Sequence, residues 1–77
     1  MIIKVLGTGC AKCIQQERAV VKAIEKTGSD ATVKKVTEIN DIMNYGVMMT
    51  PALVIDEKVV TVGKVLSAEQ IAEMINK

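Results

Sequence analysis

The sequence contains no histidine, tryptophan or phenylalanine, and Tyr45 is its single aromatic residue. Without histidine, the chain cannot use Cys–His or Ser–His nucleophilic catalysis, and it has no imidazole to bind a metal. No apolar run approaches the roughly 20 residues that a membrane-spanning helix needs. The formal net charge of +1 provides neither a basic surface for nucleic acid nor a polybasic membrane anchor. Nucleic acid and membranes are therefore not expected as partners.

The chain is short, with 77 residues of which 49% are hydrophobic. This length is near the lower limit for an unaided core, so we expect a single domain over residues 1–77. The N-terminus lacks the charged start, long apolar stretch and small-residue cleavage site of a secretory signal. We therefore expect a cytoplasmic protein, in a compartment where thiols are kept reduced and disulfides are usually transient and catalytic. We also expect a monomer.

A Cys-x-x-Cys motif at residues 10–13 is the most informative feature that is present. It follows an apolar run at residues 2–6 and a glycine-rich turn at residues 7–9, and it opens a helical pattern that extends to about Thr27. This order places Cys10 at the start of a helix and Cys13 one turn inside it. The unpaired N–H groups at a helix start favour negative charge, so we expect Cys10 to be the thiolate nucleophile.

Hydrophobic periodicity and turn residues predict the element order β-α-β-α-β-β-α. The predicted strands are 2–6, 31–36, 52–55 and 59–62, with residues 56–58 as the hairpin connection. The long first helix is expected to face the core with Cys13, Ile14, Val20, Val21 and Ile24. A short second helix is expected to be capped by Thr37, with Ile39, Ile42 and Met43 as its apolar positions. The last helix should begin with a capping box formed by Ser67 and Gln70.

A second motif, Thr50-Pro51-Ala52-Leu53-Val54, lies at the start of the third predicted strand. Proline has no N–H to give to a sheet, so Pro51 belongs at the first position of that strand. A proline in this place also suits a cis Thr50–Pro51 bond, and an ordinary trans bond is the alternative.

These motifs resemble those of the thioredoxin–glutaredoxin superfamily, and in particular its small single-domain members known as redox-active disulfide proteins. The resemblance rests on residues 9–13, 50–56 and 62–64, and together with the element order it covers nearly the whole chain. It implies an α/β, thioredoxin-like fold with a four-stranded mixed sheet and helices on both faces. It also implies that Cys10 attacks, that Cys13 resolves, and that the Thr50-Pro51 loop packs against the disulfide and pairs with an extended stretch of substrate.

The sequence departs from the common patterns of the superfamily at the motif itself. Gly9 stands where typical thioredoxins have a tryptophan, and Ala11-Lys12 stands where they have Gly-Pro. The Pro-Tyr pair of typical glutaredoxins is missing, as is the buried aspartate of larger thioredoxins. The sequence therefore leaves two routes for the proton of Cys13, to another side chain or directly to solvent.

Glu17 is our candidate for that proton acceptor, because it lies one helical turn beyond Cys13 on the inward side of the helix. Its carboxylate is either partly buried near the sulfurs or held at an edge beside a lysine. Lys12 is expected to point to solvent, either as an ordinary solvated charge or as a weak electrostatic support for the Cys10 thiolate.

Substrate contacts are expected from residues next to the proline loop and before the last helix. The candidates are Thr50, Met49, Gly63 and Lys12. The neighbouring side chains of Met48, Met49 and Tyr45 either belong to the core or form a flexible apolar rim that docks partner proteins.

The sequence thus predicts a thiol–disulfide oxidoreductase that reduces protein disulfides. Cys10 would attack a substrate disulfide, and Cys13 would then attack Cys10, release the reduced substrate and close an intramolecular disulfide. A separate reductase must restore the dithiol, because residues 7–9 lack the third glycine of a dinucleotide-binding G-x-G-x-x-G loop. We expect no bound cofactor and no resident metal.

Three alternatives use the same pair of cysteines. One is a structural pair or a metal half-site completed by a second subunit, since two cysteines supply only half of a tetrahedral zinc site. Another is a carrier of a soft metal ion on two thiolates, although such ferredoxin-like carriers have the order β-α-β-β-α-β. The third is a redox-sensing interaction module that turns over no substrate.

Overall fold

The computed structural model describes residues 1–75, so Asn76 and Lys77, the last residues of the expected domain, lie outside the described part. Its elements are β1 (Ile2–Leu6), α1 (Ala11–Thr27), β2 (Thr32–Val36), α2 (Ile39–Asn44), β3 (Ala52–Ile55), β4 (Lys58–Val62) and α3 (Ala68–Ile75). This order is the one predicted from the sequence.

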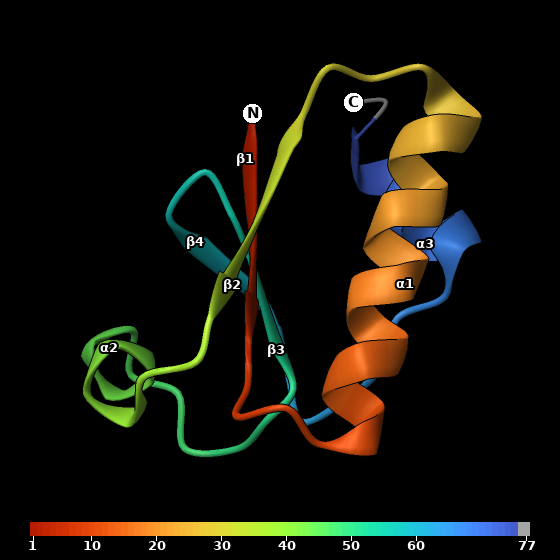
Figure 1. The fold of residues 1–77 in the computed structure, drawn as a ribbon. Helices are drawn as coiled ribbons and strands as arrows, with labels where there is room; N and C mark the ends of the chain where they lie inside the picture. Colours follow the sequence, from red (N-terminus) through yellow and green to blue (C-terminus); the bar gives the residue numbers. More distant parts are fainter. Residues whose placement is uncertain (76–77) are drawn as a thin grey trace.

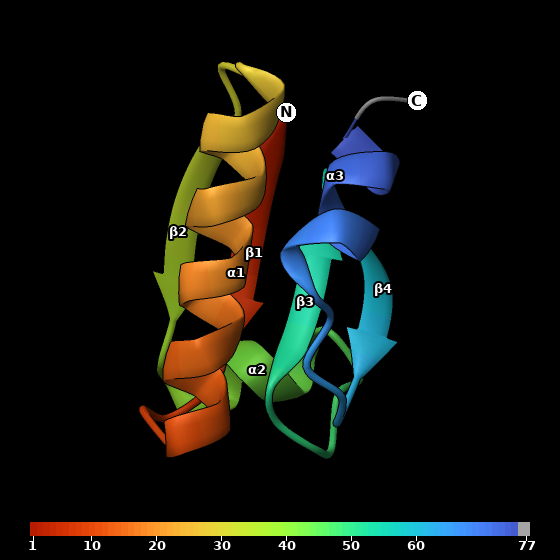
Figure 2. The same ribbon diagram turned by 90° about the vertical axis from the view of Figure 1, so that its right-hand side faces the viewer.

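The four strands form one mixed sheet in the order β2-β1-β3-β4. β1 runs parallel to β2 and antiparallel to β3, and β3 runs antiparallel to β4. The two central strands are the aliphatic runs at residues 2–6 and 52–55, which suits strands that are covered on both faces. α1 and α3 lie side by side on one face of the sheet, and α2 lies on the other (Figures 1 and 2). The predicted α/β fold class is therefore confirmed.

Each face of the sheet carries its own hydrophobic cluster, because neighbouring strand residues point to opposite faces. The buried members on the side of α1 and α3 are Ile3, Val5, Val20, Ala23, Leu53, Ala68, Ile71 and Ala72. The buried members on the side of α2 are Leu6, Ile42, Val47, Ala52 and Val54. The larger cluster fixes α1, and therefore the start of α1, against the sheet.

The inward face of α1 matches the prediction at Cys13 and Val20, and Ile24 packs partly buried against the core. Its buried residues are Cys13, Gln16, Val20 and Ala23, which follow helical spacing. The predicted inward positions Ile14 and Val21 are exposed instead. The prediction was wrong at these two positions because it assigned aliphatic side chains to the core and passed over Gln16. The end of the helix is as expected, with Gly28 in the left-handed conformation at a φ of 66°.

α2 and the hairpin also differ from the sequence prediction in detail. Glu38 rather than Thr37 precedes the first turn of α2, and its side chain makes no capping hydrogen bond. Ile42 alone of the residues in α2 is buried, because a helix of six residues presents less than two turns to the sheet; Ile39 and Met43 are exposed. The hairpin loop has two residues, Asp56 and Glu57, both with positive φ.

The start of α3 has the predicted capping box. The Gln70 N–H donates to Ser67 Oγ at 3.2 Å, and the Ser67 N–H donates to Gln70 Oε1 at 3.0 Å. Each side chain thus satisfies a backbone donor that the helix start leaves free. Across residues 1–75, none of the helices combines the length and apolar character that crossing a membrane would require.

Candidate redox site

Cys10 and Cys13 form a disulfide at the start of α1, with their Cα atoms 5.0 Å apart. The two sulfurs differ in environment. Cys10 is exposed, whereas Cys13 is only 6% exposed and packs against the end of β1. A disulfide partner arriving from solvent can therefore reach Cys10 but not Cys13.

The local backbone makes Cys10 the N-cap of α1. Its φ of −68° and ψ of 165° are extended rather than helical, and its Sγ accepts the N–H of Cys13 at 3.2 Å. The first turn of the helix carries no acidic side chain. A sulfur in this position lies at the positive end of the helix dipole with no carboxylate competing for it, which stabilises a thiolate.

Gly7 provides the space that the buried sulfur occupies. A Cβ at this position would collide with Sγ of Cys13 and would lie 3.0 Å from its Cβ and 3.8 Å from Cβ of Thr50. The backbone of Gly7 is held by a hydrogen bond from its N–H to the carbonyl of Val36 at 3.0 Å. Gly7 thus lies between Cys13 and the Thr50-Pro51 loop, and the absence of a side chain lets both approach.

The Thr50-Pro51 loop brings several of the predicted contact residues together. The Thr50–Pro51 peptide bond is cis, and Pro51 is buried. The Pro51 carbonyl accepts the N–H of Gly63 at 2.8 Å. The side chain of Met49 lies over Gly63, with its Cε 3.3 Å from the place a Cβ of Gly63 would take. Met49, Thr50 and Gly63 therefore lie together at the surface, next to the buried Pro51.

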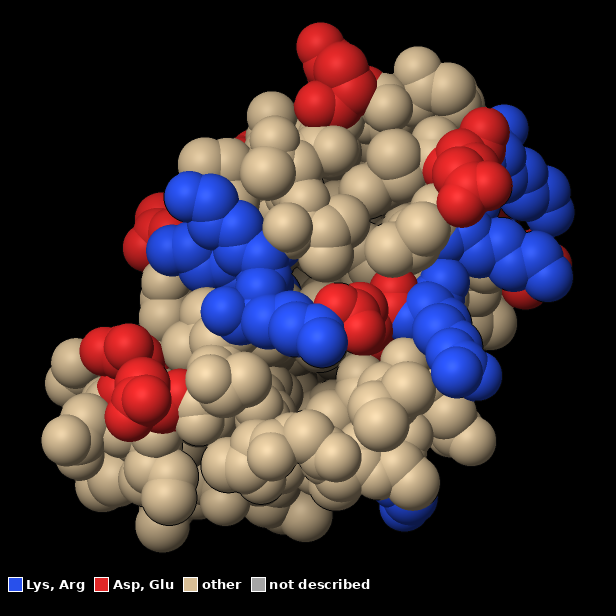
Figure 3. All heavy atoms as spheres, viewed as in Figure 1, with Lys and Arg blue, Asp and Glu red and all other residues tan. Residues whose placement is uncertain are grey.

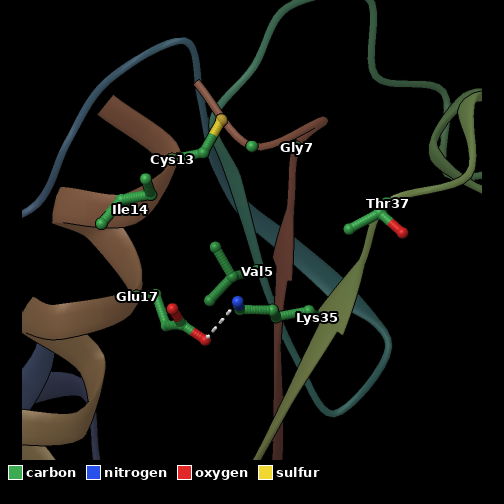
Figure 4. A pocket seen from close by; sticks show the side chains of 8 residues that line it. Val5, Gly7, Cys13, Ile14, Glu17, Lys35 and Thr37 are labelled. Carbon is green, nitrogen blue, oxygen red and sulfur yellow. Dashed lines mark ion pairs between the residues drawn. The ribbon is translucent and has the colours of Figure 1, made fainter. Parts of the chain in front are cut away.

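A small pocket lies behind Cys13, between α1 and the ends of β1 and β2. Its volume is about 50 Å³, enough for a few water molecules. Cys13 lines one end, and an ion pair between Glu17 and Lys35 lines the other, with Val5 in the wall between them (Figure 4). The Glu17 Oε2 lies 3.3 Å from Lys35 Nζ, and the glutamate side chain is 28% exposed. Of the two expected placements, Glu17 thus has the one at an edge beside a lysine.

The remaining predicted residues differ in exposure and in their contacts. Met48 is 97% exposed and Met49 is also exposed, so both belong to an apolar rim and not to the core. Tyr45 is half-buried and accepts a hydrogen bond from Lys4 Nζ at 2.6 Å. Lys12 is exposed on the first turn of α1.

Figure 3 shows few charged groups at the lower end of the molecule, where α1 begins.

Gln16 is a residue of this region that the sequence prediction missed. It is fully buried one turn beyond Cys13, and its side-chain amide bonds both backbone groups of Leu66. Helical spacing from Cys13 was the available signal for an inward position, but a glutamine is more often exposed.

The described residues contain no complete metal site. Within residues 1–75, no group of three or more His, Cys, Asp or Glu side chains is placed to hold a metal ion. The observed order of elements also differs from that of the ferredoxin-like carriers.

Comparison with known proteins agrees with the geometry. A family model described as a thioredoxin domain matches residues 1–76. The chain is similar to a thioredoxin of Methanocaldococcus jannaschii, with 42% identity over 73 residues that cover 95% of this chain and 84% of the relative. It is also similar to a thioredoxin of Methanothermobacter thermautotrophicus, with 33% identity over 76 residues that cover 99% of both chains.

Membership of this family implies protein disulfides as substrates and a reductase as the source of electrons. The disulfide between Cys10 and Cys13 at the start of α1 provides the redox group for such exchange. The family match and the two relatives, taken with this disulfide, show that the chain belongs to the thioredoxin family and is a thiol–disulfide oxidoreductase.

Proposed function

We propose that the two cysteines of this oxidoreductase have unequal roles, with Cys10 as the attacking group and Cys13 as the resolving group. The observation that carries this assignment is the contrast between an exposed Cys10 at the helix N-cap and a buried Cys13. The Cys10 thiolate attacks one sulfur of a substrate disulfide, and the other substrate sulfur leaves as a thiolate. This step forms a mixed disulfide.

The second step returns the protein to its disulfide form. Cys13 loses its proton and attacks Sγ of Cys10, so that the second substrate sulfur leaves as a thiolate. The substrate has then gained two electrons, and the Cys10–Cys13 disulfide has formed. A separate reductase supplies two electrons to restore the dithiol.

Substrate docking is assigned to the surface formed by Met49, Thr50 and Gly63, which the buried Pro51 supports from below. Its support is the hydrogen bond from the Gly63 N–H to the Pro51 carbonyl and the exposed methionine side chains beside them. Methionine is flexible and polarisable, which suits a surface that must accept different protein segments. Lys12, which is exposed in the first turn of α1, is assigned to substrate contact as well and supports the Cys10 thiolate weakly.

Glu17 is assigned as the proton acceptor of the resolving step. It shares the pocket behind Cys13, and that pocket has room for water between the sulfur and the carboxylate. Lys35 keeps the carboxylate at the edge of this pocket through their ion pair. A proton from Cys13 can then reach Glu17 through one or more waters and pass on to solvent.

We further propose that residues 1–77 act as a single domain, as a monomer in the cytoplasm. The reducing conditions of that compartment suit a disulfide that forms and breaks in each cycle.

The roles of the cysteines are tested by trapping. Cys13→Ser should hold a disulfide-bonded peptide as a mixed disulfide that dithiothreitol releases, because the second nucleophile is gone. Cys10→Ser is the matched control and should trap nothing. Mass spectrometry of the peptide adducts distinguishes the two. Capture by Cys10→Ser and not by Cys13→Ser would reverse the assignment.

The role of Glu17 is tested by stopped-flow measurement of the resolving step. Glu17→Gln should slow resolution several-fold and leave the initial attack by Cys10 unchanged, because only resolution requires a proton to leave Cys13. Glu25→Gln, at an exposed position of the same helix, is the control. Equal resolution rates in wild type and Glu17→Gln would show that Glu17 is only an edge carboxylate.

A further inference from the structure

Gln16 is, among residues 1–75, the one polar side chain that is completely buried. Placing an amide in an apolar interior costs free energy unless its donor and acceptor are both hydrogen-bonded. An aliphatic residue at this position of α1 would fill the core without that cost. We therefore expect the amide to form hydrogen bonds that the fold requires.

The partner is the backbone of Leu66. Nε2 of Gln16 donates to the Leu66 carbonyl at 3.3 Å, and Oε1 accepts the Leu66 N–H at 2.9 Å. Leu66 lies in the irregular connection between β4 and α3, which spans residues 63–67. We call its first four residues, Gly63–Leu66, the 63–66 segment. Gln16 thus replaces the pairing that a sheet would give to these two backbone groups.

The other end of the 63–66 segment is tied to the proline loop. The Gly63 N–H donates to the Pro51 carbonyl at 2.8 Å, and Gly63 packs against the side chain of Met49. The segment therefore connects α1, one turn beyond Cys13, with the surface assigned to substrate docking.

We propose that Gln16 is a positioning residue for substrate docking. It fixes Leu66, the 63–66 segment keeps Gly63 in place, and Gly63 in turn holds Pro51 and Met49 in the arrangement that receives a substrate segment. The inference rests on the proposed docking role of Met49, Thr50, Pro51 and Gly63. Gln16 is fully buried, so it acts through these residues and not by contact with a substrate.

Gln16→Met separates this role from core filling. Methionine has nearly the same length but offers no strong donor or acceptor, so the two backbone groups of Leu66 must turn to water. The 63–66 segment then gains freedom, and a substrate must order it on binding. The N-cap at Cys10 is untouched, so the reactivity of the sulfur should not change.

The test compares a docking substrate with one that cannot dock. Insulin, with dithiothreitol as the recycling reductant, gives kcat and KM, and 5,5′-dithiobis(2-nitrobenzoate) reports the reactivity of Cys10 toward a small disulfide. We expect Gln16→Met to raise KM for insulin about fivefold, while kcat and the rate with the small disulfide stay within about twofold of wild type.

Val20→Ala is the matched control, because Val20 is fully buried on the same helix face but offers no polar group to the 63–66 segment. It should lower the free energy of unfolding without raising KM. An equal rise of KM in both variants would overturn the inference, since the effect would then follow stability alone. An unchanged KM in Gln16→Met would also overturn it.

Two further outcomes are decisive. If Gln16→Met does not fold, Gln16→Asn replaces it; the neutral amide is one methylene shorter and cannot bond both backbone groups of Leu66 in the same way, so a smaller rise of KM is expected and an unchanged KM overturns the inference. A wild-type protein that reacts with the small disulfide but not with insulin would overturn the proposed docking surface, and the role of Gln16 with it.

Discussion

At the scale of single residues, the redox site depends on how closely groups approach the buried sulfur. Gly7 is required for space and not for an unusual backbone conformation, since it is not among the glycines with positive φ. Its missing side chain leaves the volume that Cys13 occupies. This makes Gly7 part of the site, although it contributes no chemical group.

Gly7→Ala should therefore lower the free energy of unfolding by about 1–3 kcal/mol, the usual cost of overpacking a filled interior. Because the added methyl group meets Sγ and Cβ of Cys13, the loss should be smaller when Cys13 is alanine. Denaturant titration of the four reduced proteins in this double-mutant cycle measures the coupling. The same loss in both backgrounds would show that the methyl group is accommodated elsewhere.

A second residue-scale prediction concerns the ion pair between Lys4 and Glu57, whose Nζ and Oε1 lie 2.6 Å apart. The hydrogen bond from Lys4 lowers the pKa of the Glu57 carboxyl below its ordinary value of 4.5. The folded state then binds this proton less readily than the unfolded state. The pair's contribution is present above pH 4.5 and is lost as the pH falls through the lowered pKa.

Glu57→Gln should make the stability of the protein less sensitive to acid in that range, which thermal unfolding between about pH 3 and 6 would measure. The effect should be modest, because the glutamate side chain is 66% exposed and water screens the pair. Glu25→Gln serves as an exposed control. An acid transition that keeps its wild-type steepness in Glu57→Gln would contradict the prediction.

Some residue placements followed from the sequence and others could not. Cys10 and Cys13 were located because a short motif and its flanking elements define a helix start. The sequence did not identify Lys35 as the partner of Glu17. The two side chains meet only because β2 pairs in parallel with β1. Gln16 was missed because the need for its amide arises from the backbone of Leu66, a residue 50 positions away.

At the scale of secondary structure, the best predictions were those with a local physical cause. The strands at residues 2–6 and 52–55 were placed correctly because each is an aliphatic run next to a glycine or a proline. The short α2 has no side-chain cap at its N-terminus and buries only Ile42, so the sequence of this helix gave a weak signal. The hairpin was predicted one residue too long, because Glu57 takes a left-handed conformation that glutamate seldom adopts.

The capping box of α3 gives a prediction at this scale. Ser67→Ala should lower the free energy of unfolding by about 1 kcal/mol, because the Gln70 N–H loses its acceptor. In the Ser67→Ala background, Gln70→Ala should lower the free energy of unfolding by less than it does in the wild type. The reason is that the two hydrogen bonds hold the same backbone turn. Chemical denaturation measures both effects, with Glu73→Ala as an exposed control on α3. Strictly additive losses would show that the two bonds act independently.

At the scale of the whole molecule, the two faces of the sheet are unequally covered. α1 and α3 bury the larger cluster on one face, whereas α2, with six residues, covers the other face together with Val47 and the loop around it (Figure 2). The redox site lies where these parts meet, since Gly7 follows β1, Cys10 begins α1 and Pro51 follows the α2 region. A rigid side therefore holds the sulfurs, and a less firmly packed side carries part of the rim.

Native-state hydrogen exchange should reveal this division. For a chain of this size we expect global unfolding to require roughly 4–12 kcal/mol, and amides of β1, β3 and the middle of α1 should exchange only through that opening. Amides of α2 should exchange through a smaller opening, because one buried isoleucine and no side-chain cap hold the helix. Their exchange should also depend weakly on denaturant, since a local opening exposes little surface. If α2 amides showed the same opening free energy and denaturant dependence as those of β1, the two sides of the sheet would form one cooperative unit.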